Sequence, residues 1–194
     1  MKLIGMTEAG DAGRDLTWYD KLIKDDNYVG AILITKYGHR PEFQDKALDL
    51  LLNHKPCIIH FGCTGWGNTP MEPGNPTPET LLRSIRAFID RGFPAKNCVL
   101  RIDPIIPTTE GIARAKDTLR LAAEIIPDIT RIRIRISIYD DYHCSREEMI
   151  RRGYPPIDNI TKWKSEQERR PTPIQVRTVA QSLLSVVDPA GFSG

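Results

Sequence analysis

Five short apolar runs recur along the chain, beginning near residues 2, 30, 57, 98 and 131. The first four are each followed by a segment with the apolar spacing of a helix. This alternation predicts a parallel sheet, because parallel neighbours need a crossover connection and a helix usually supplies it. We therefore expect an α/β fold, a partial and open TIM-like βα barrel of about five to six units with parallel strands. The chain has 194 residues, whereas a complete eight-unit barrel takes about 250.

Charge and hydropathy place few further limits on the chain. Lys and Arg number 27 against 25 Asp and Glu, and the resulting net charge of +2 does not by itself indicate binding to nucleic acid or to an anionic membrane. No apolar run is long enough to cross a bilayer, and Met1–Gly5 leads into polar residues rather than into the apolar part of a signal peptide. We expect one cytoplasmic domain over residues 1–194, with no membrane attachment and no recognisable sixth strand.

The stretch Val99–Thr108 lies at the centre of this pattern. Apolar side chains share one face of its strand, whereas Arg101 and Asp103 share the other, and Pro104 ends regular pairing. The strand therefore carries an arginine and a carboxylate to its carboxyl end, where parallel α/β proteins usually place their chemistry. Asp103 could orient the arginine or act as a base. The alternative is an internal ion pair that only fills space.

Strict alternation marks the fifth run, residues 131–138. Isoleucines occupy one face, and Arg131, Arg133, Arg135 and Ser137 occupy the other. In a βα array the helices pack on the isoleucine face, so the arginines point inward beside Arg101; in an open antiparallel sheet the same pattern would mean one solvated face. We favour the first interpretation because four strand–helix units precede this strand.

The inner face then carries more cations than acids. Asp103 and Glu8 are the acids that could pair with its arginines, and we take both as candidate catalytic residues. The remaining positive charge indicates a small anionic ligand or a nucleotide, held in part by bidentate arginine contacts. The alternative is a set of solvated charges inside an incomplete, water-filled barrel.

Other candidate binding residues follow from their position near the ends of the predicted strands. His60 shares a strand face with Gly62, which leaves room for a ligand, although a lone strand histidine is more often a core residue. The Gly-rich loop that contains Glu8 is not a dinucleotide fingerprint, and a plain connection is its default interpretation. The full set of candidate binding residues is Arg14, Lys36, His60, Thr64, Trp66, Asn68, Arg101, Arg133, Arg135 and Asp140.

The longest irregular stretch, Gly65–Pro76, is dense in Gly, Asn and Pro. A loop of this length in a compact domain is either functional or disordered. Trp66 and Met71 favour a packed lid over the carboxyl ends of the strands. A ligand bound beneath this lid would change the fluorescence of Trp66.

The four cysteines do not form the spacing of a metal site. Cys57 and Cys98 begin strands at their amino ends, whereas Cys63 and Cys144 lie near strand ends and could face the mouth. No CxxC or CxxxCxxC spacing is present, so we assign no metal ligands. A composite site of Cys63, His143 and Cys144 has no supporting spacing.

Several motifs resemble a bacterial family described as DNA repair photolyase-like, which is similar to spore photoproduct lyase and other radical S-adenosylmethionine proteins. The resemblance covers roughly residues 1–145, and its most specific parts are the loop Thr64–Asn68 and the Arg-Ile-Asp-Pro sequence that begins at Arg101. The motifs that carry it are Ile34–Lys36, Cys57–Asn68, Glu72–Pro73, Gly92–Pro94, Val99–Thr108 and Arg133–Tyr142. The resemblance implies a partial βα barrel, an S-adenosylmethionine-type cofactor and a nucleic-acid substrate.

One departure from that family concerns its iron–sulfur centre. The resemblance implies a [4Fe–4S] cluster held by a cysteine cluster beyond the matched region, and this sequence has no such cluster of cysteines. We do not expect [4Fe–4S] from this chain alone, which leaves a truncated, a degenerate and a partner-dependent relative as alternatives. Two functional classes follow: a radical S-adenosylmethionine enzyme that lacks or borrows its cluster, and a cluster-free βα-barrel protein that binds an anionic small molecule or nucleotide.

Overall fold

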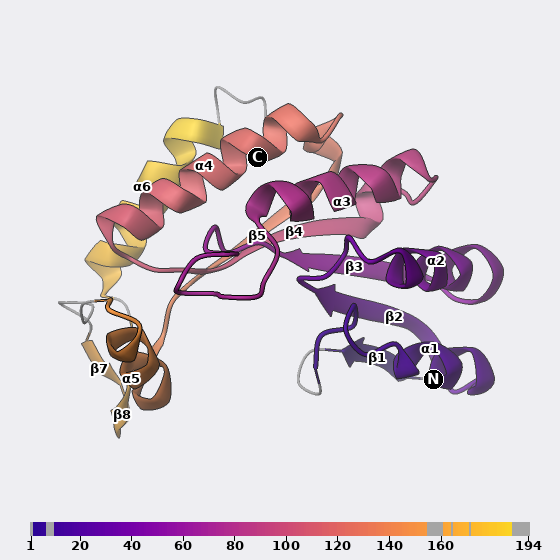
Figure 1. The fold of residues 1–194 in the computed structure, drawn as a ribbon, viewed down its shortest axis with the longest axis horizontal. Coiled ribbons are helices and arrows are strands. Elements are labelled where there is room, and N and C mark those ends of the chain that lie inside the picture. Colours follow the sequence, from indigo (N-terminus) through magenta and orange to yellow (C-terminus); the bar gives the residue numbers. More distant parts are fainter. Residues whose placement is uncertain (1, 7–9, 155–160, 164, 171, 188–194) are drawn as a thin grey trace.

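The computed structural model describes residues 2–6, 10–154, 161–163, 165–170 and 172–187. Among these residues, five parallel strands form one sheet in the order β1-β2-β3-β4-β5 (Figure 1). The strands are β1 (Lys2–Met6), β2 (Tyr28–Thr35), β3 (Cys57–Gly62), β4 (Cys98–Ile105) and β5 (Arg133–Ile138). The parallel α/β prediction is confirmed; the sheet is open, with β1 and β5 at its two edges, and it does not close into a barrel.

The helices that connect these strands pack on one face of the sheet (Figure 1). They are α1 (Thr17–Lys24), α2 (Pro41–Asp49), α3 (Pro78–Asp90) and α4 (Thr109–Ile125), and α6 (Pro173–Val187) packs beside α4. A short π-helical turn at Leu50–His54 continues α2, and 3₁₀ turns at Ala95–Asn97 and Ile129–Arg131 precede β4 and β5. No helix in the described part of the chain is long and apolar enough to cross a membrane.

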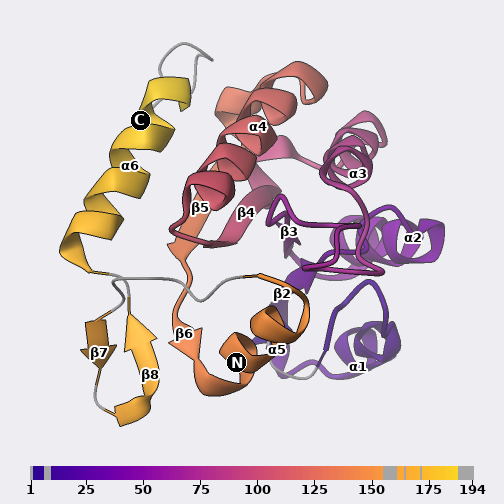
Figure 2. The same cartoon turned by 60° about the vertical axis from the view of Figure 1, so that its left-hand side comes forward.

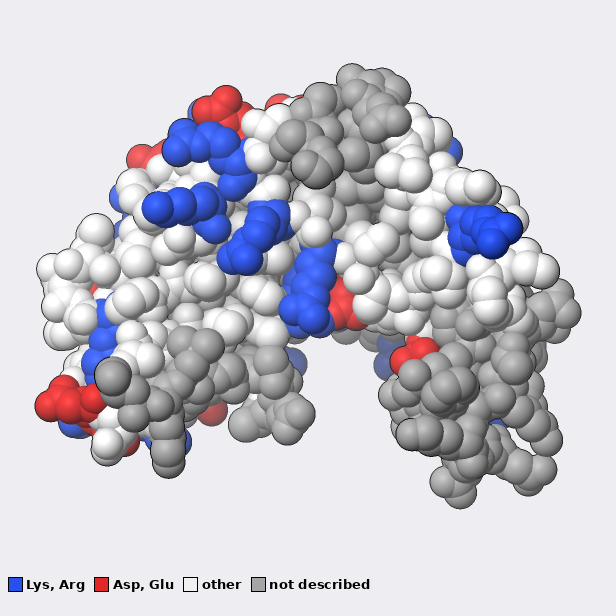
Figure 3. Space-filling view, turned by 180° about the vertical axis from the view of Figure 1, so that it is seen from behind, with Lys and Arg blue, Asp and Glu red and all other residues white. Residues whose placement is uncertain are grey.

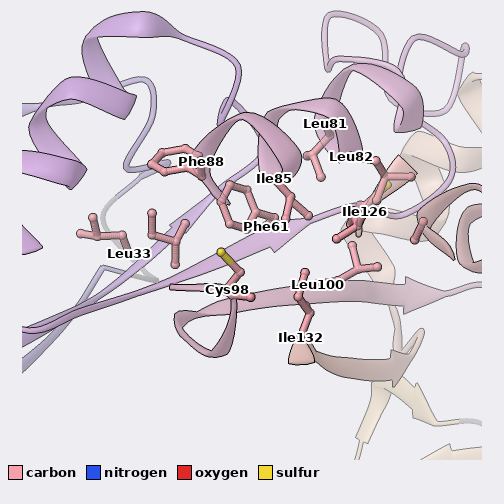
Figure 4. Close-up of a cluster of buried hydrophobic side chains, with 14 of the residues drawn as sticks. Leu33, Phe61, Leu81, Leu82, Ile85, Phe88, Cys98, Leu100, Ile126 and Ile132 are labelled. Atoms are coloured by element: carbon pink, nitrogen blue, oxygen red, sulfur yellow. The ribbon is translucent and has the colours of Figure 1, made fainter. Parts of the chain in front are cut away.

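The core lies between the helices and the face of the sheet that they cover. Alternate residues of the strands, among them Phe61 and Leu100, are fully buried against Ile85 and Phe88 of α3 (Figure 4). Aromatic rings interlock there: Phe88 makes edge-to-face contacts with Phe61 at 5.5 Å and with Phe93 at 5.4 Å. The apolar alternation of the strands therefore selects which face the helices cover.

Within the described ranges, no helix layer covers the opposite face of the sheet. The near-continuous apolar run of β2 predicts burial on both faces, but Ile32 and Ile34 are only half-buried. Burial on both faces is typical of a doubly covered sheet, and here the crossover helices all lie on one side. This uncovered side is called the open face below.

A second, smaller sheet follows the main one. It is antiparallel, in the order β6-β8-β7, and consists of β6 (Asp141–Tyr142), β7 (Thr161–Trp163) and β8 (Ser165–Arg170). Figure 2 shows α5 (His143–Arg151) and this sheet beyond the carboxyl ends of the main strands. The sequence gives no strand signal here, because β8 is almost entirely polar and charged.

Candidate functional site

The strand registers bring His60 and three arginines to the open face. The pairing of β4 with β5 sets Arg101 beside Arg135 and Val99 beside Arg133. The pairing of β3 with β4 sets Gly62 beside Arg101 and His60 beside Val99. Ile134 and Ile138 of β5 and Ile132 just before it pack against the core on the helix side, whereas Ile136 is exposed. The arginines therefore point away from the helices, as the alternation of residues 131–138 predicts.

Arg101 forms an ion pair with Asp103 on this face. The side chains are 22% and 23% exposed, so the pair is half-buried rather than free in solvent. The other oxygen of Asp103 accepts a hydrogen bond from the Ser137 hydroxyl. The buried Nε of Arg101 has no hydrogen-bond partner among the described residues. Burial, followed by the charge of Arg135, lowers the pKa of Arg101.

His60 lies among these cations. Burial lowers the pKa of His60 to about 4, and the charges of Arg101, Arg135 and Arg133 act in the same direction. The imidazole is therefore neutral at pH 7, and its buried Nδ1 has no partner in the part of the chain that the structure describes. Neutral His60 offers a hydrogen bond without adding charge to the face.

Arg133 and Arg135 are exposed and form no ion pair with a described residue. Figure 3 shows Lys and Arg side chains following one another across the open side toward the hollow at its lower edge. An acidic side chain lies beside the last of these cations in that view. The charges described at the centre of the face are thus three arginines against Asp103, which leaves net positive charge facing solvent.

The loop of residues 65–76 is tied to the sheet by Glu72. One oxygen of Glu72 binds the Lys36 ammonium at 2.6 Å, and the other accepts a hydrogen bond from the Thr64 hydroxyl at 2.8 Å. Thr64 Oγ1 also accepts from the backbone N–H of Trp66 at 3.1 Å. Lys36 follows β2 and Thr64 follows β3, so this network joins two strand ends to the loop.

Trp66 is buried inside that loop, with 3% of its surface exposed. The guanidinium of Arg114 lies over its ring, 4.3 Å from the centroid, and Tyr154 contacts the ring edge-to-face at 5.6 Å. Asn68 is exposed and adopts a positive φ of 59°, a conformation that asparagine tolerates better than most residues. The loop is packed against the fold, and its action as a lid stays a prediction.

The remaining predicted site residues lie around this centre. Arg14 is exposed, with its guanidinium 5.1 Å from the centroid of the Tyr37 ring, while Asp11 in the same loop anchors the end of β2 through hydrogen bonds to Thr35 and to the Lys36 N–H. Asp140 is half-buried just beyond β5. Glu8 lies outside the described residues, so its predicted role stays a prediction.

Three cysteines lie on the helix-covered side rather than at the mouth. Cys57 and Cys98 begin β3 and β4, as predicted, and are buried. The expectation that Cys63 faces the mouth is wrong: it lies in the core, because the residue after β3 continues the buried side of the alternation. Burial raises the pKa of each of the three thiols to about 12. The side chains of His143 and Cys144 lie outside the described part.

Residues that sequence reasoning did not single out complete the site. Ser137 binds Asp103, and its place in the alternation of β5 already carried that signal. Arg114 reaches Trp66 from α4, and Arg152 reaches the loop from beyond α5, where its Nη1 donates to the carbonyls of Met71 at 2.7 Å and Pro70 at 3.2 Å. No local pattern predicts these last two contacts, because they join segments far apart in the sequence.

The described residues of this site do not provide a set of ligands for an iron–sulfur cluster. Among the described residues, no group of three or more His, Cys, Asp and Glu side chains is arranged to hold a metal ion. Cys57, Cys63 and Cys98 are also buried on the helix-covered side of the sheet, away from the open face. The described residues therefore do not fit such a cluster.

Comparison with known proteins shows a likeness of fold. No family model matches this chain, and no curated protein matches it in sequence. A spore photoproduct lyase mutant solved with bound AdoMet and dinucleoside spore photoproduct is similar at a TM-score of 0.71 and 10% identity, over 100% of this chain and 62% of that chain. Another mutant of the same lyase gives a TM-score of 0.74 at 11% identity, over 98% and 59%. This chain therefore shares the fold of spore photoproduct lyase structures, and it spans about three-fifths of their length.

Proposed function

We propose that this chain is a radical S-adenosylmethionine-related, spore photoproduct lyase-like protein whose open face binds an anionic, nucleotide-type ligand. The observation that supports the proposal most is the excess of arginine on that face, where Arg101, Arg133 and Arg135 face a single described acid, Asp103. The fold adds support, because a structure that shares it was solved with AdoMet and a dinucleoside.

The chemistry of the face suits an anion. Exposed Arg133 and Arg135 have their guanidinium groups available for bidentate contacts to a phosphate or carboxylate. Neutral His60 lies on the same face, two strands away on β3, and can add a hydrogen bond without opposing charge. The carboxylate of S-adenosylmethionine and the phosphates of a nucleotide are both ligands of this class.

Asp103 is better placed to orient Arg101 than to accept a proton. One of its oxygens accepts from Arg101 and the other from Ser137. A carboxylate held by two donors is stabilised in its ionised form and fixes the direction of the guanidinium beside it. We assign Asp103 the positioning of Arg101, and Glu8 stays an untested candidate for the acid–base role.

The described residues are assigned ligand binding and orientation, and no radical step. Radical chemistry requires a cluster held by thiolates, and Cys57, Cys63 and Cys98 are buried away from the open face. The second candidate function is a cluster-free protein that binds an anionic small molecule or nucleotide without redox chemistry. Formation of 5′-deoxyadenosine from S-adenosylmethionine would separate the two.

Binding tests the proposal directly. Fluorescence anisotropy of a labelled dinucleotide and calorimetry with S-adenosylmethionine would be measured on the wild type and on Arg133→Gln and Arg135→Gln. Each substitution should weaken binding of the anionic ligand about tenfold, because one charge-assisted contact is lost. Arg120→Gln on the outer surface of α4 is the matched control and should bind as the wild type does. Equal affinities for all four proteins would refute the proposal.

A further inference from the structure

Helix α6 presents an apolar stripe to solvent. Val176, Ala180 and Leu184 are all exposed, Val176 at 43% and Leu184 at 56%. They recur at every fourth residue, so they lie on one ridge along the helix. A neighbouring stripe of the same helix is buried in the core and consists of Val179, Leu183 and Val186. The apolar arc of α6 is therefore wider than the part that the fold covers.

The rest of the exposed surface of α6 carries almost no charge. Arg177 is the single charged side chain among its 15 residues, whereas α4, which packs beside it, has six among 17. Figure 3, which views the molecule from behind, shows the side on which α6 lies as largely white around one group of blue atoms. A surface helix usually presents charged residues opposite its apolar face, so this surface is typical of a contact rather than of a free helix.

The stripe is complementary to itself. Ala180 is its smallest member and lies midway between Val176 and Leu184, about 6 Å from each along the helix axis. In an antiparallel pair with a two-fold axis at Ala180, the small side chains let the two backbones approach, and Val176 of each copy lies beside Leu184 of the other. Ridges of residues four apart interdigitate in the commonest class of helix packing, with axes about 8–10 Å apart.

Charge selects this occupant over others. Nucleic acid is bound through several cations, and α6 offers Arg177 alone. A helix that lies on a membrane has Lys and Arg along its polar face, whereas the exposed polar residues of α6 besides Arg177 are Thr178, Gln181 and Ser185. In the antiparallel pair the two Arg177 side chains lie on opposite sides of the two-fold axis, so they do not face each other.

We propose that this face of α6 is the contact between two copies of the chain, which pack antiparallel across Ala180 as a two-fold dimer. One helix per copy makes a contact that is small beside a standard interface of about 1,600 Å², so the dimer is weak and exchanges with monomer. The helix lies on the covered side of the sheet. None of the open-face arginines takes part, so failure of either proposal leaves the other intact.

Sedimentation equilibrium of the intact chain over about 10–500 μM should show a reversible monomer–dimer equilibrium. Ala180→Glu sets two carboxylates against each other at the axis and should raise the dissociation constant at least about tenfold, because juxtaposed like charges oppose association. Gln181→Glu is the matched control. It adds the same charge to the next residue, which points away from the stripe, and should change the constant less than about twofold. Circular dichroism verifies that each variant is folded.

Crosslinking through an introduced cysteine locates the axis. Ala180→Cys should give a disulfide-linked dimer on mild oxidation, because the close approach of the helices brings the two positions within the Cα–Cα reach of a disulfide, about 4.4–6.8 Å. Gln181→Cys should crosslink far less, as should the wild type, in which Cys57, Cys63 and Cys98 are buried.

Several outcomes would overturn the proposal. A wild-type chain that stays monomeric over the whole concentration range does so, and this result needs no variant to fold. If that monomer floats with vesicles of phosphatidylglycerol, the face belongs to a membrane instead. Equal weakening of the dimer by Ala180→Glu and Gln181→Glu, or equal crosslinking of the two cysteine variants, would place the contact elsewhere than on this stripe.

Discussion

Replacing Asp103 with alanine tests whether the ion pair of the open face stabilises the fold. Removal of one partner from a fully buried ion pair costs about 3–5 kcal/mol, whereas an exposed pair contributes about 0–1 kcal/mol. The side chains of Arg101 and Asp103 are 22% and 23% exposed, between these limits. We therefore expect a loss of about 2 kcal/mol in the free energy of unfolding, because Arg101, whose buried Nε has no partner among the described residues, would lose its counterion beside Arg135.

Urea denaturation followed by circular dichroism measures this loss, and thermal unfolding should show a Tm lowered by about 4–8 °C for a chain of this size. Asp117→Ala is the matched control, because Asp117 pairs with Arg120 at 2.8 Å on the exposed surface of α4; it should change stability by less than about 0.5 kcal/mol. A double-mutant cycle of Asp103→Ala with Arg101→Gln isolates the coupling between the pair. If Asp103→Ala costs no more than Asp117→Ala, the pair is solvated and the reasoning fails.

Three further predictions concern other parts of the site. The pKa of His60 is about 4 in the folded chain, whereas its ordinary value is 6.5, so the unfolded state binds the proton first and stability falls as the pH drops from about 6.5 to about 4. His60→Gln should remove about 1 kcal/mol of that fall, allowing for the partial solvent exposure of the side chain. An unchanged dependence of stability on pH in urea denaturation would contradict this prediction. Lys36→Met should speed amide hydrogen exchange at Asn68 with little change in global stability, because it removes the ion pair that holds Glu72, whose carbonyl accepts from the Asn68 N–H. Exchange no faster than in the control Lys96→Met would show that the Lys36–Glu72 ion pair does not hold the loop. Anaerobic reconstitution with iron and sulfide should yield no stable [4Fe–4S] cluster on this chain alone and no 5′-deoxyadenosine, because Cys57, Cys63 and Cys98 are buried thiols; a reduced-cluster electron paramagnetic resonance signal at near-stoichiometric iron would disprove this.

The sequence predicts the main sheet because its signals there are local. Strands β2 to β4 are short apolar runs, each preceded or followed by a helix with an apolar stripe, and both features depend only on residue spacing. The two-residue alternation of Arg133–Ile138 likewise assigns each side chain to one face of a strand without knowledge of its neighbours.

Other features of the site cannot be predicted from local residue spacing. Whether β2 is buried on one face or two depends on where the helices pack, and the open face left Ile32 and Ile34 half-buried. Cys63 is buried because the alternation of β3 continues one residue past Gly62, and the sequence alone does not reveal how far a strand keeps its alternation beyond its paired residues. The small sheet of β6, β7 and β8 forms from polar segments whose pairing carries no hydrophobic period.

By itself, the sequence determines the parallel strand–helix order and the shared face of Arg101, Arg133 and Arg135, because backbone geometry converts residue spacing directly into direction. The tertiary structure alone decides that Arg114 covers Trp66 and that Arg152 ties the loop to α5. These contacts join side chains separated by dozens of residues, and their formation depends on how the packed elements approach one another rather than on any pattern within one segment.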